Sequence, residues 1–290
     1  MTLLSFQIAA SVLMTSFGAP PILVTNLDGS GLTIEWSVDK TRTPEPDTAR
    51  VRIVNLLQLS RKALAEVASL GLGLNVSLMI GWQKVPTMVF NGLAHKITPE
   101  TFEGTDIVTT VECGAGGDIS SSSPSSAAIA GAGVPLVLAK LLGDLKIPPS
   151  PTAFPEVTAA AAKVPAANLF QWVTTGNPRE DLDLLMASIG LSWGIERGFF
   201  VVYAGGLRND LLPLLLSPST GLVKWAPLDD GGYEFEALAD ASAAPGQQVI
   251  MTDEKSLPIG GPLRIDKLVY TGSTRGPSIM QGTARKVVIL

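Results

Sequence analysis

The fold class is decided by the stretch LTIEWSVDK at residues 32–40, where apolar and polar side chains alternate. A period of two is typical of a strand that buries one face. Pro44 and Pro46 then predict a turn, and the sequence ARVRI at residues 49–53 resumes the alternation. We therefore predict a β-hairpin in this segment.

Working outward, further strands are predicted at residues 74–80, 107–113, 233–237, 248–252, 263–270 and 279–289. The first 27 residues carry no charged side chain, and we interpret them as one or two buried strands. A signal peptide would need basic residues near Met1, and a spanning helix would need about 20 continuous apolar residues. The start of the chain has no basic residue, and residues 18–21 (GAPP) interrupt the apolar run.

A short helix is predicted between the first strands. Ser60 is the expected N-cap, and Gly71 is expected just past the last turn, where a left-handed residue stops a helix. Leu64, Val67 and Ala68 would share its buried face.

The middle section is predicted to mix helices with a hairpin. The apolar stripe of its first helix is Val134, Val137, Leu138, Leu141, Leu142 and Leu145. Residues 148–168 are rich in Pro and Ala and are expected to be irregular. A second helix begins with Asn177 as N-cap and Pro178 in the first turn. Residues 191–195 and 199–203 then predict a hairpin across an Arg197-Gly198 turn.

Residues 114–133 are dominated by Gly, Ser and Ala, which is typical of a flexible connector. We therefore predict an N-terminal β domain at 1–117, a linker at 118–133, an α/β insert at 134–210 and a C-terminal β domain at 211–290. The predicted fold class is α+β and mostly β.

Charged residues make up only 16% of the 290 residues, against roughly 25% in an ordinary soluble domain. A surface so poor in charge favours a chain that is covered by other subunits. The net charge of −5 and the absence of a basic run argue against tight binding to nucleic acid, which depends on Lys and Arg.

No catalytic, metal or cofactor site is predicted. The single histidine, His95, lies in a predicted strand without a nucleophile-elbow serine to serve, and the single cysteine, Cys113, fits a small core residue. Asp229-Asp230 fits a turn, and Glu180-Asp181 fits the start of a helix. The glycines at 114–117 lack the lysine of a phosphate-binding loop.

Several segments resemble phage baseplate and tail-tip hub proteins. The opening hairpin ends in Asn55-Leu56 before a Ser-Arg-x-x-Leu helix, although Asp47 replaces the family's usual Asn before the second strand. The insert carries a Gly-Leu-x-Trp element that ends in Trp193.

The C-terminal part is similar to the same family at a Ser-Pro-x-Thr-Gly-Leu segment, with Ser217, Thr220 and Gly221, and at the turn Pro245-Gly246. The family's later His-x-Gly-Asp element is replaced by residues 270–273 (YTGS), so no role of its His or Asp is carried over.

The resemblance implies two tube-like, barrel-type β domains that flank the insert. It implies a homotrimer whose six β domains form a ring between the tail tube and the spike. The implied partners are a tail tube or distal tail protein, a spike or tip protein and a tape measure protein. DNA would pass through the lumen without specific binding. The chain would belong to the virion tail, be present in the host cytoplasm during assembly, and not insert into a membrane itself.

Two other interpretations remain open at this stage. One is another tail ring component, such as a distal tail or tube protein, which usually lacks the insert at residues 178–203. The other is a secreted bacterial surface-binding module, which would require cleavage near Ala19.

Overall fold

The computed structural model describes residues 8–16, 20–26, 32–82, 86–115, 129–130, 133–164, 171–172, 174–255 and 257–287. Within this part the chain is mostly β, with a 13-stranded sheet, two two-stranded sheets and a smaller share of helix. The predicted class, α+β and mostly β, is confirmed.

The N-terminal part of the large sheet is a run of antiparallel strands. They are β1 (Ile8–Ser16), β2 (Ile22–Thr25), β3 (Thr33–Thr41), β4 (Thr48–Val54), β5 (Leu74–Trp82), β6 (Thr87–Glu103) and β7 (Asp106–Gly114). Their order across the sheet is β3-β4-β7-β6-β5-β1-β2. The predicted hairpin is confirmed as β3–β4, with Val38 opposite Ala49.

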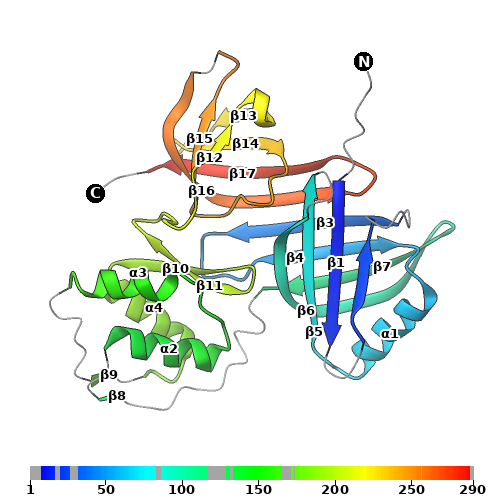
Figure 1. Cartoon of the computed structure of the whole chain (residues 1–290), viewed down its shortest axis with the longest axis horizontal. Helices are drawn as coiled ribbons and strands as arrows, with labels where there is room; N and C mark the ends of the chain where they lie inside the picture. Colours follow the sequence, from blue (N-terminus) through cyan, green and yellow to red (C-terminus); the bar gives the residue numbers. More distant parts are fainter. Residues whose placement is uncertain are drawn as a thin grey trace.

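The C-terminal part continues the same sheet. Its strands are β12 (Leu214–Leu216), β13 (Leu222–Pro227), β14 (Tyr233–Leu238), β15 (Gln248–Thr252), β16 (Pro258–Ser273) and β17 (Ser278–Lys286). The long strand β16 pairs with β3, from Lys267 opposite Thr41 to Ser273 opposite Glu35. Figure 1 shows β16 and β17 running across toward the N-terminal strands. The two β regions therefore share one hydrogen-bonded sheet, and among the described strands no sheet closes on itself.

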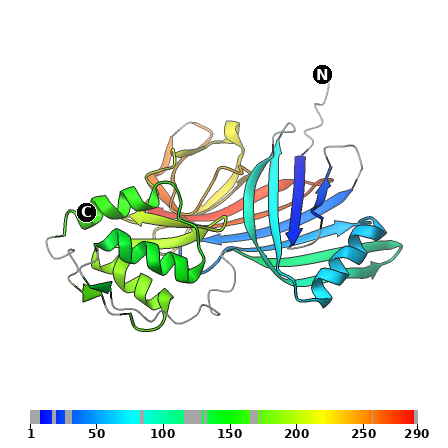
Figure 2. The same cartoon turned by 60° about the horizontal axis from the view of Figure 1, so that its bottom comes forward.

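The insert lies beside this sheet as a separate layer of helices on a hairpin (Figure 2). We use the name insert for α2 (Val134–Leu145), α3 (Ala153–Ala161), α4 (Pro178–Ser188), β10 (Leu191–Glu196) and β11 (Phe199–Ala204). The remaining elements are α1 (Gln58–Ser69), β8 (Ile129–Ala130), β9 (Gln171–Trp172) and the 3-10 turn η2 (Pro218–Thr220).

The insert contains both the best and the worst of the sequence predictions. All six predicted apolar positions of α2 are buried. At the start of α4 the Asn177 side chain accepts a hydrogen bond from the Arg179 N–H, as predicted. The irregular structure predicted for residues 148–168 is wrong, because α3 forms there. Pro155 lies in the first turn of α3, where its missing N–H is no loss, and Ala153 and Val157 supply a buried face.

The helix α1 begins earlier than predicted, and its buried face is narrower. Ser60 lies inside the helix, and the N-cap residue is Leu57. The buried Leu56 fixes the chain upstream of Ser60, and Arg61 donates a hydrogen bond of 2.6 Å to the Leu56 carbonyl oxygen. Ala68 is exposed, although Leu64 and Val67 are buried as predicted. Gly71 follows the helix in the left-handed conformation, as predicted.

The predicted N-terminal strands are confirmed as β1 and β2, and β1 pairs with β5 along its whole length. Of the predicted linker, residues 118–128 and 131–132 lie outside the described residues, as do residues 288–289 of the last predicted strand. The domain boundaries at residues 117, 133 and 210 stay predictions. No helix within the described ranges is long and apolar enough to cross a membrane.

Candidate functional site: a buried ionic cluster between the sheet and the insert

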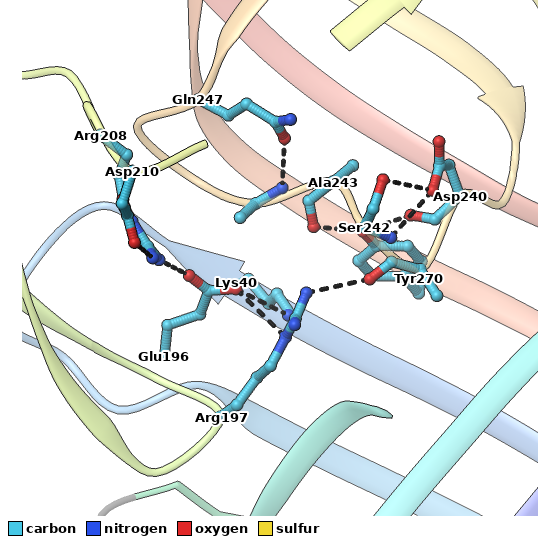
Figure 3. A network of polar contacts seen from close by, with 12 residues as sticks. Lys40, Glu196, Arg197, Arg208, Asp210, Asp240, Ser242, Ala243, Gln247 and Tyr270 are labelled. Carbon is cyan, nitrogen blue, oxygen red and sulfur yellow. Dashed lines mark hydrogen bonds and ion pairs between the residues drawn. The ribbon is translucent and has the colours of Figure 1, made fainter. Parts of the chain in front are cut away.

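Buried charged side chains gather where the hairpin β10–β11 of the insert meets strand β3. Lys40 is fully buried near the end of β3, and Glu196, at the end of β10, is 5% exposed. Asp47, which directly precedes β4, is also buried. We call these three residues, together with Arg197, Arg208 and Asp210, the junction cluster (Figure 3).

The strand pattern explains how Lys40 comes to be buried. Ile34, Trp36 and Val38 point into the core, and the next position on the same face is Lys40. Glu196 occupies the corresponding place at the end of β10, directly before the Arg197-Gly198 turn. Both turn residues have positive φ, 53° and 81°, as a two-residue hairpin turn of type I′ requires.

Glu196 is the centre of the junction cluster. One carboxylate oxygen, Oε1, lies 3.6 Å from Lys40 Nζ and 3.3 Å from Arg197 Nε. The other, Oε2, accepts a hydrogen bond from Arg208 Nη1. Arg208 also donates from Nε to Asp210 Oδ1 at 2.8 Å. A single carboxylate therefore connects β3, the hairpin turn and the segment that leaves the insert.

A second set of polar contacts connects this point to the C-terminal strands. Arg197 Nη2 donates to the Ala241 carbonyl oxygen at 3.0 Å. The buried Tyr270 hydroxyl donates to the Ala243 carbonyl oxygen at 2.7 Å, and Lys40 Nζ lies 5.6 Å from the centre of the Tyr270 ring. Gln247 Nε2 donates to the Leu212 carbonyl oxygen at 2.7 Å. Figure 3 shows the contacts of Arg197 and Tyr270 and, apart from them, the hydrogen bond that the Gln247 side-chain oxygen accepts from the Ala244 N–H.

The electrostatics of the junction cluster are governed by burial. Burial lowers the pKa of Lys40 and raises the pKa of Asp47 to about 7, because both groups lose hydration in their charged forms. The Glu196 carboxylate works against the lowering of the Lys40 pKa, and the backbone N–H groups of Arg197 and Thr41 work against the raising of the Asp47 pKa. Such burial is costly, so the cluster contributes geometric specificity to the junction more than net stability.

Two of the residues predicted from the resemblance lie where β4 ends. Asn55 has a φ of 57°, and its side chain donates to Asp106 Oδ1 and accepts from the Ile107 N–H. Leu56 is buried, and its carbonyl oxygen accepts a hydrogen bond from Arg61 on α1. These contacts close the β4–β7 end of the sheet.

Trp193 lies inside the insert. It is buried in β10, and its Nε1 donates to Asp183 Oδ1 on α4 at 2.7 Å. Its ring lies 5.7 Å from that of Phe200 on β11. Trp193 therefore fixes the hairpin against the helices.

The Ser217 segment forms a capped turn before β13. Ser217 and Thr220 form a capping box, each side chain bonded to the other's backbone N–H. Gly221 has a φ of 105°, and a Cβ on it would lie 3.0 Å from the Leu238 side chain. The turn therefore sets the start of the β13–β14 hairpin.

Of the predicted residues, Pro245-Gly246 is the pair that borders the junction. Gly246 donates its N–H to the Ile265 carbonyl oxygen and accepts from the Arg208 N–H. A Cβ on Gly246 would lie 2.5 Å from Tyr203 Cε1. The structure thus places the predicted residues at four separate points and does not bring them into one site.

The residues that the sequence analysis considered as catalytic candidates occupy ordinary structural positions. His95 is exposed on β6, and burial raises the pKa of the Cys113 thiol to about 12. Asp230 forms a turn contact with the Gly232 N–H, and Glu180 accepts from the Asn177 side chain at the start of α4. No group of His, Cys, Asp and Glu suited to a metal ion occurs among the described residues.

Sequence reasoning missed the junction cluster. The available signal was Lys40, a charged residue at the next apolar position of a regular strand pattern. Its partners Glu196 and Arg208 lie more than 150 residues away in the sequence, and no local pattern connects them to Lys40.

No protein-family model matches the sequence, and neither does any curated protein sequence. Solved structures do match. The tail protein from Neisseria meningitidis MC58 superposes with a TM-score of 0.61 at 11% identity, covering 97% of both chains. The 43 kDa tail protein of prophage MuSo2 from Shewanella oneidensis gives 0.60 at 9% identity, covering 95% of this chain and 98% of that one.

A third match is the E. coli c3393 protein, a component of the type VI secretion system described as structurally similar to the T4 bacteriophage tail proteins gp27 and gp5. It has a TM-score of 0.53 at 9% identity, over 95% of this chain and 77% of that one. The resemblance found in the sequence is thus confirmed at the level of the fold: this chain has the fold of phage tail proteins over nearly its whole length.

Proposed function

We propose that this chain is a non-enzymatic structural subunit of a phage tail, the hub at the baseplate or tail tip that joins the tail tube to the central spike. The observation that carries the proposal is the match to two phage tail proteins over at least 95% of each chain. A match confined to a common β-sandwich or barrel would give much weaker support for a function, because such folds occur in many unrelated proteins.

The large sheet offers edges suited to ring assembly. Its strand path ends at β13 on one side and at β2 on the other. All of β13 after Leu222 is exposed, including Val223 and Trp225. Unpaired edges with apolar side chains are a liability in a monomer, and contact between different edges of neighbouring copies generates a closed ring.

The composition agrees with such an assembly. Large apolar side chains are exposed on several elements of the C-terminal β region, and a neighbour that covered them would compensate for the low charge content. These side chains are Leu212, Leu215, Val223, Trp225, Leu238 and Leu257.

In the proposed hub, three copies place two β regions each around a channel, giving six similar units beneath the tail tube. The tube or distal tail protein lies above, the spike or tip protein lies below, and a tape measure protein is a further partner. The chain's net charge of −5 suits a wall along which DNA slides without binding. The working location is the virion tail, after assembly in the host cytoplasm.

The insert favours a hub over a distal tail or tube protein, which usually lacks it. The secreted module is disfavoured by β1, whose nine residues all pair with β5, since cleavage near Ala19 would remove this strand from the sheet.

Native mass spectrometry of the purified protein tests the proposal. We expect trimers that a Trp225→Glu substitution weakens, because the new charge would be buried against the neighbouring copy. The matched control is Leu184→Glu on the exposed face of α4, which leaves the trimer intact. A protein that stays monomeric at high concentration, both alone and with its tail partners, contradicts the hub.

A further inference from the structure

One face of the large sheet carries charged and polar side chains across both β regions. In β3 the residues Ile34, Trp36 and Val38 are buried, and the alternate positions Glu35 and Asp39 lie on the opposite, partly exposed face. We call the face that carries Glu35 and Asp39 the polar face. The same alternation of buried and exposed positions occurs in β4, β14 and β17. Because β3 pairs with both β4 and β16, the polar face continues from the N-terminal to the C-terminal β region.

In the N-terminal half of the polar face, charges of opposite sign face each other on neighbouring strands. Arg50 on β4 and Lys96 on β6 both lie opposite Glu112 on β7. Glu112 Oε1 lies 3.9 Å from Arg50 Nε and 3.4 Å from Lys96 Nζ. Arg52 on β4 lies opposite Glu35 on β3, with 2.6 Å between Arg52 Nη1 and Glu35 Oε2. Each of these three cations therefore has a carboxylate partner on the adjacent strand.

The same pairing continues through the C-terminal half. Facing positions on β13, β14, β17, β16 and β3 are occupied in turn by Lys224, Glu236, Gln281, Val269 and Asp39. Lys224 Nζ lies 3.0 Å from Glu236 Oε2, and the same oxygen accepts a hydrogen bond of 2.9 Å from Gln281 Nε2. Where the two β regions meet, Lys267 Nζ on β16 lies 3.4 Å from Asp39 Oδ1 on β3. Exposed ion pairs contribute little to stability, so a series of pairs across both regions calls for another explanation.

The bulk of the chain lies on the other side of the sheet. Val38, on the buried side of β3, belongs to one apolar core together with Leu64 of α1 and Leu182 of α4. On the polar face, the side chains of Lys224 and Lys267 are more than half exposed, and a hollow of about 340 Å³ lies between them. A sheet that forms part of a closed ring has less room on its inside than on its outside. The bare polar face therefore suits the inside of the ring, and the side with the core and the helices suits the outside.

We propose that the carboxylates of the polar face keep its lysines and arginines from binding duplex DNA that passes along this face. The inference rests on the proposed tail function. Proteins gain affinity for DNA when Lys and Arg neutralise phosphates and release the counterions of the DNA. A cation that is already balanced by an adjacent carboxylate gains less from a phosphate, and the carboxylate repels the phosphate as it approaches. The pairing on this face, more than the net charge of the whole chain, then leaves DNA free to slide.

A triple variant of the polar face tests the proposal on the purified full-length protein. Asp39→Asn, Glu112→Gln and Glu236→Gln remove three of its carboxylate charges and preserve the shape of the side chains. Fluorescence anisotropy with labelled duplex DNA at low ionic strength should show binding at least about tenfold tighter than that of the wild type. The logarithm of the binding constant should fall with the logarithm of the salt concentration by about 0.9 for each freed cation that contacts a phosphate.

The matched control makes the same change in net charge elsewhere. It carries three substitutions at exposed positions on α1, at the start of α4 and after β15: Glu66→Gln, Glu180→Gln and Glu254→Gln. This control should bind DNA no more tightly than the wild type, because it frees no cation on the polar face. Equal DNA affinity in the two triple variants would overturn the proposal.

Removal of the freed cations identifies what binds the DNA. Lys224→Gln and Lys267→Gln, added to the triple variant of the polar face, should lower its DNA affinity toward that of the wild type. If the affinity stays as high as before, the freed lysines do not contact DNA, and the role proposed for their carboxylate partners is wrong.

Phage particles distinguish this inference from the hub itself. Tails that contain the triple variant of the polar face should assemble normally and eject DNA in vitro several-fold more slowly than tails that contain the matched control. Unchanged ejection from tails that carry the variant would overturn the inference and leave the hub standing. Tails that lack the chain altogether would contradict the hub.

Discussion

The insert is joined to itself and to the sheet by two different kinds of contact. Between α2 and α4 the packing is apolar, formed by residues such as Leu138 and Leu182, both fully buried. Between the insert and the sheet, the described contacts include a network of buried charges centred on Glu196. Apolar packing tolerates small shifts, whereas an ion network has one satisfactory geometry. The comparison indicates that the insert is built for stability and its junction for orientation.

The largest effect should come from breaking the junction. Arg208→Ala leaves the buried carboxylate of Glu196 without its closest partner, and we expect a loss of about 3–5 kcal/mol in unfolding free energy. Chemical denaturation measures it. Arg50→Ala, which removes an exposed ion pair to Glu112, should cost at most about 1 kcal/mol. Equal losses of unfolding free energy in the two variants would show that the junction cluster stabilises the fold no more than an exposed ion pair does.

Truncation of a buried side chain inside the insert should lower the free energy of unfolding slightly less than the loss of Arg208 does. Leu182→Ala opens a cavity between α4 and α2, and we expect a loss of about 3 kcal/mol. Leu184→Ala, on the exposed face of the same helix, should change the unfolding free energy by less than about 0.5 kcal/mol. Thermal or denaturant unfolding of the two variants separates packing from helix propensity. A similar cost at both positions would contradict the apolar interface.

A glycine at the junction provides a smaller and sharper test. Gly246→Ala combines a φ of 79° with a Cβ placed 2.5 Å from Tyr203 Cε1, and we expect a loss of about 2 kcal/mol. Gly261→Ala has nearly the same φ, 81°, but meets nothing within 4 Å, so it should lose only the backbone part, about 1 kcal/mol. Identical losses of unfolding free energy would mean that the Tyr203 side chain moves away from the new Cβ at no cost.

The smallest effect is expected at the start of α4. Asn177→Ala removes the acceptor for the Arg179 N–H, which should cost about 1 kcal/mol. Hydrogen exchange should show faster exchange in the first turn of α4, with β3 and β16 unchanged. A matching acceleration in β3 would show that the insert and the sheet unfold together, contrary to the comparison.

The elements themselves were predictable because their signals are local. The alternation at residues 32–40 gave β3, the stripe from Val134 to Leu145 gave α2, and Asn177-Pro178 gave the start of α4. The helix α3 was missed because the Pro and Ala content of residues 148–168 was interpreted as irregular structure, although a proline such as Pro155 is tolerated in the first turn of a helix.

The junction could not be predicted in the same way. Whether Lys40 ends a strand in solvent or in the core depends on where β10 packs, and Glu196 lies 156 positions further along the sequence. The pairing of β3 with β16 likewise joins segments from opposite ends of the chain. Both are set by tertiary packing, which a period of two along one strand does not encode.

Cryo-electron microscopy of tails from particles that contain this chain tests the central claim most directly. The hub predicts one ring of three copies at the tip, with both β regions lining the channel and the insert on the outside. Density for the chain repeated along the whole tube, or its absence from the particle, would contradict the account.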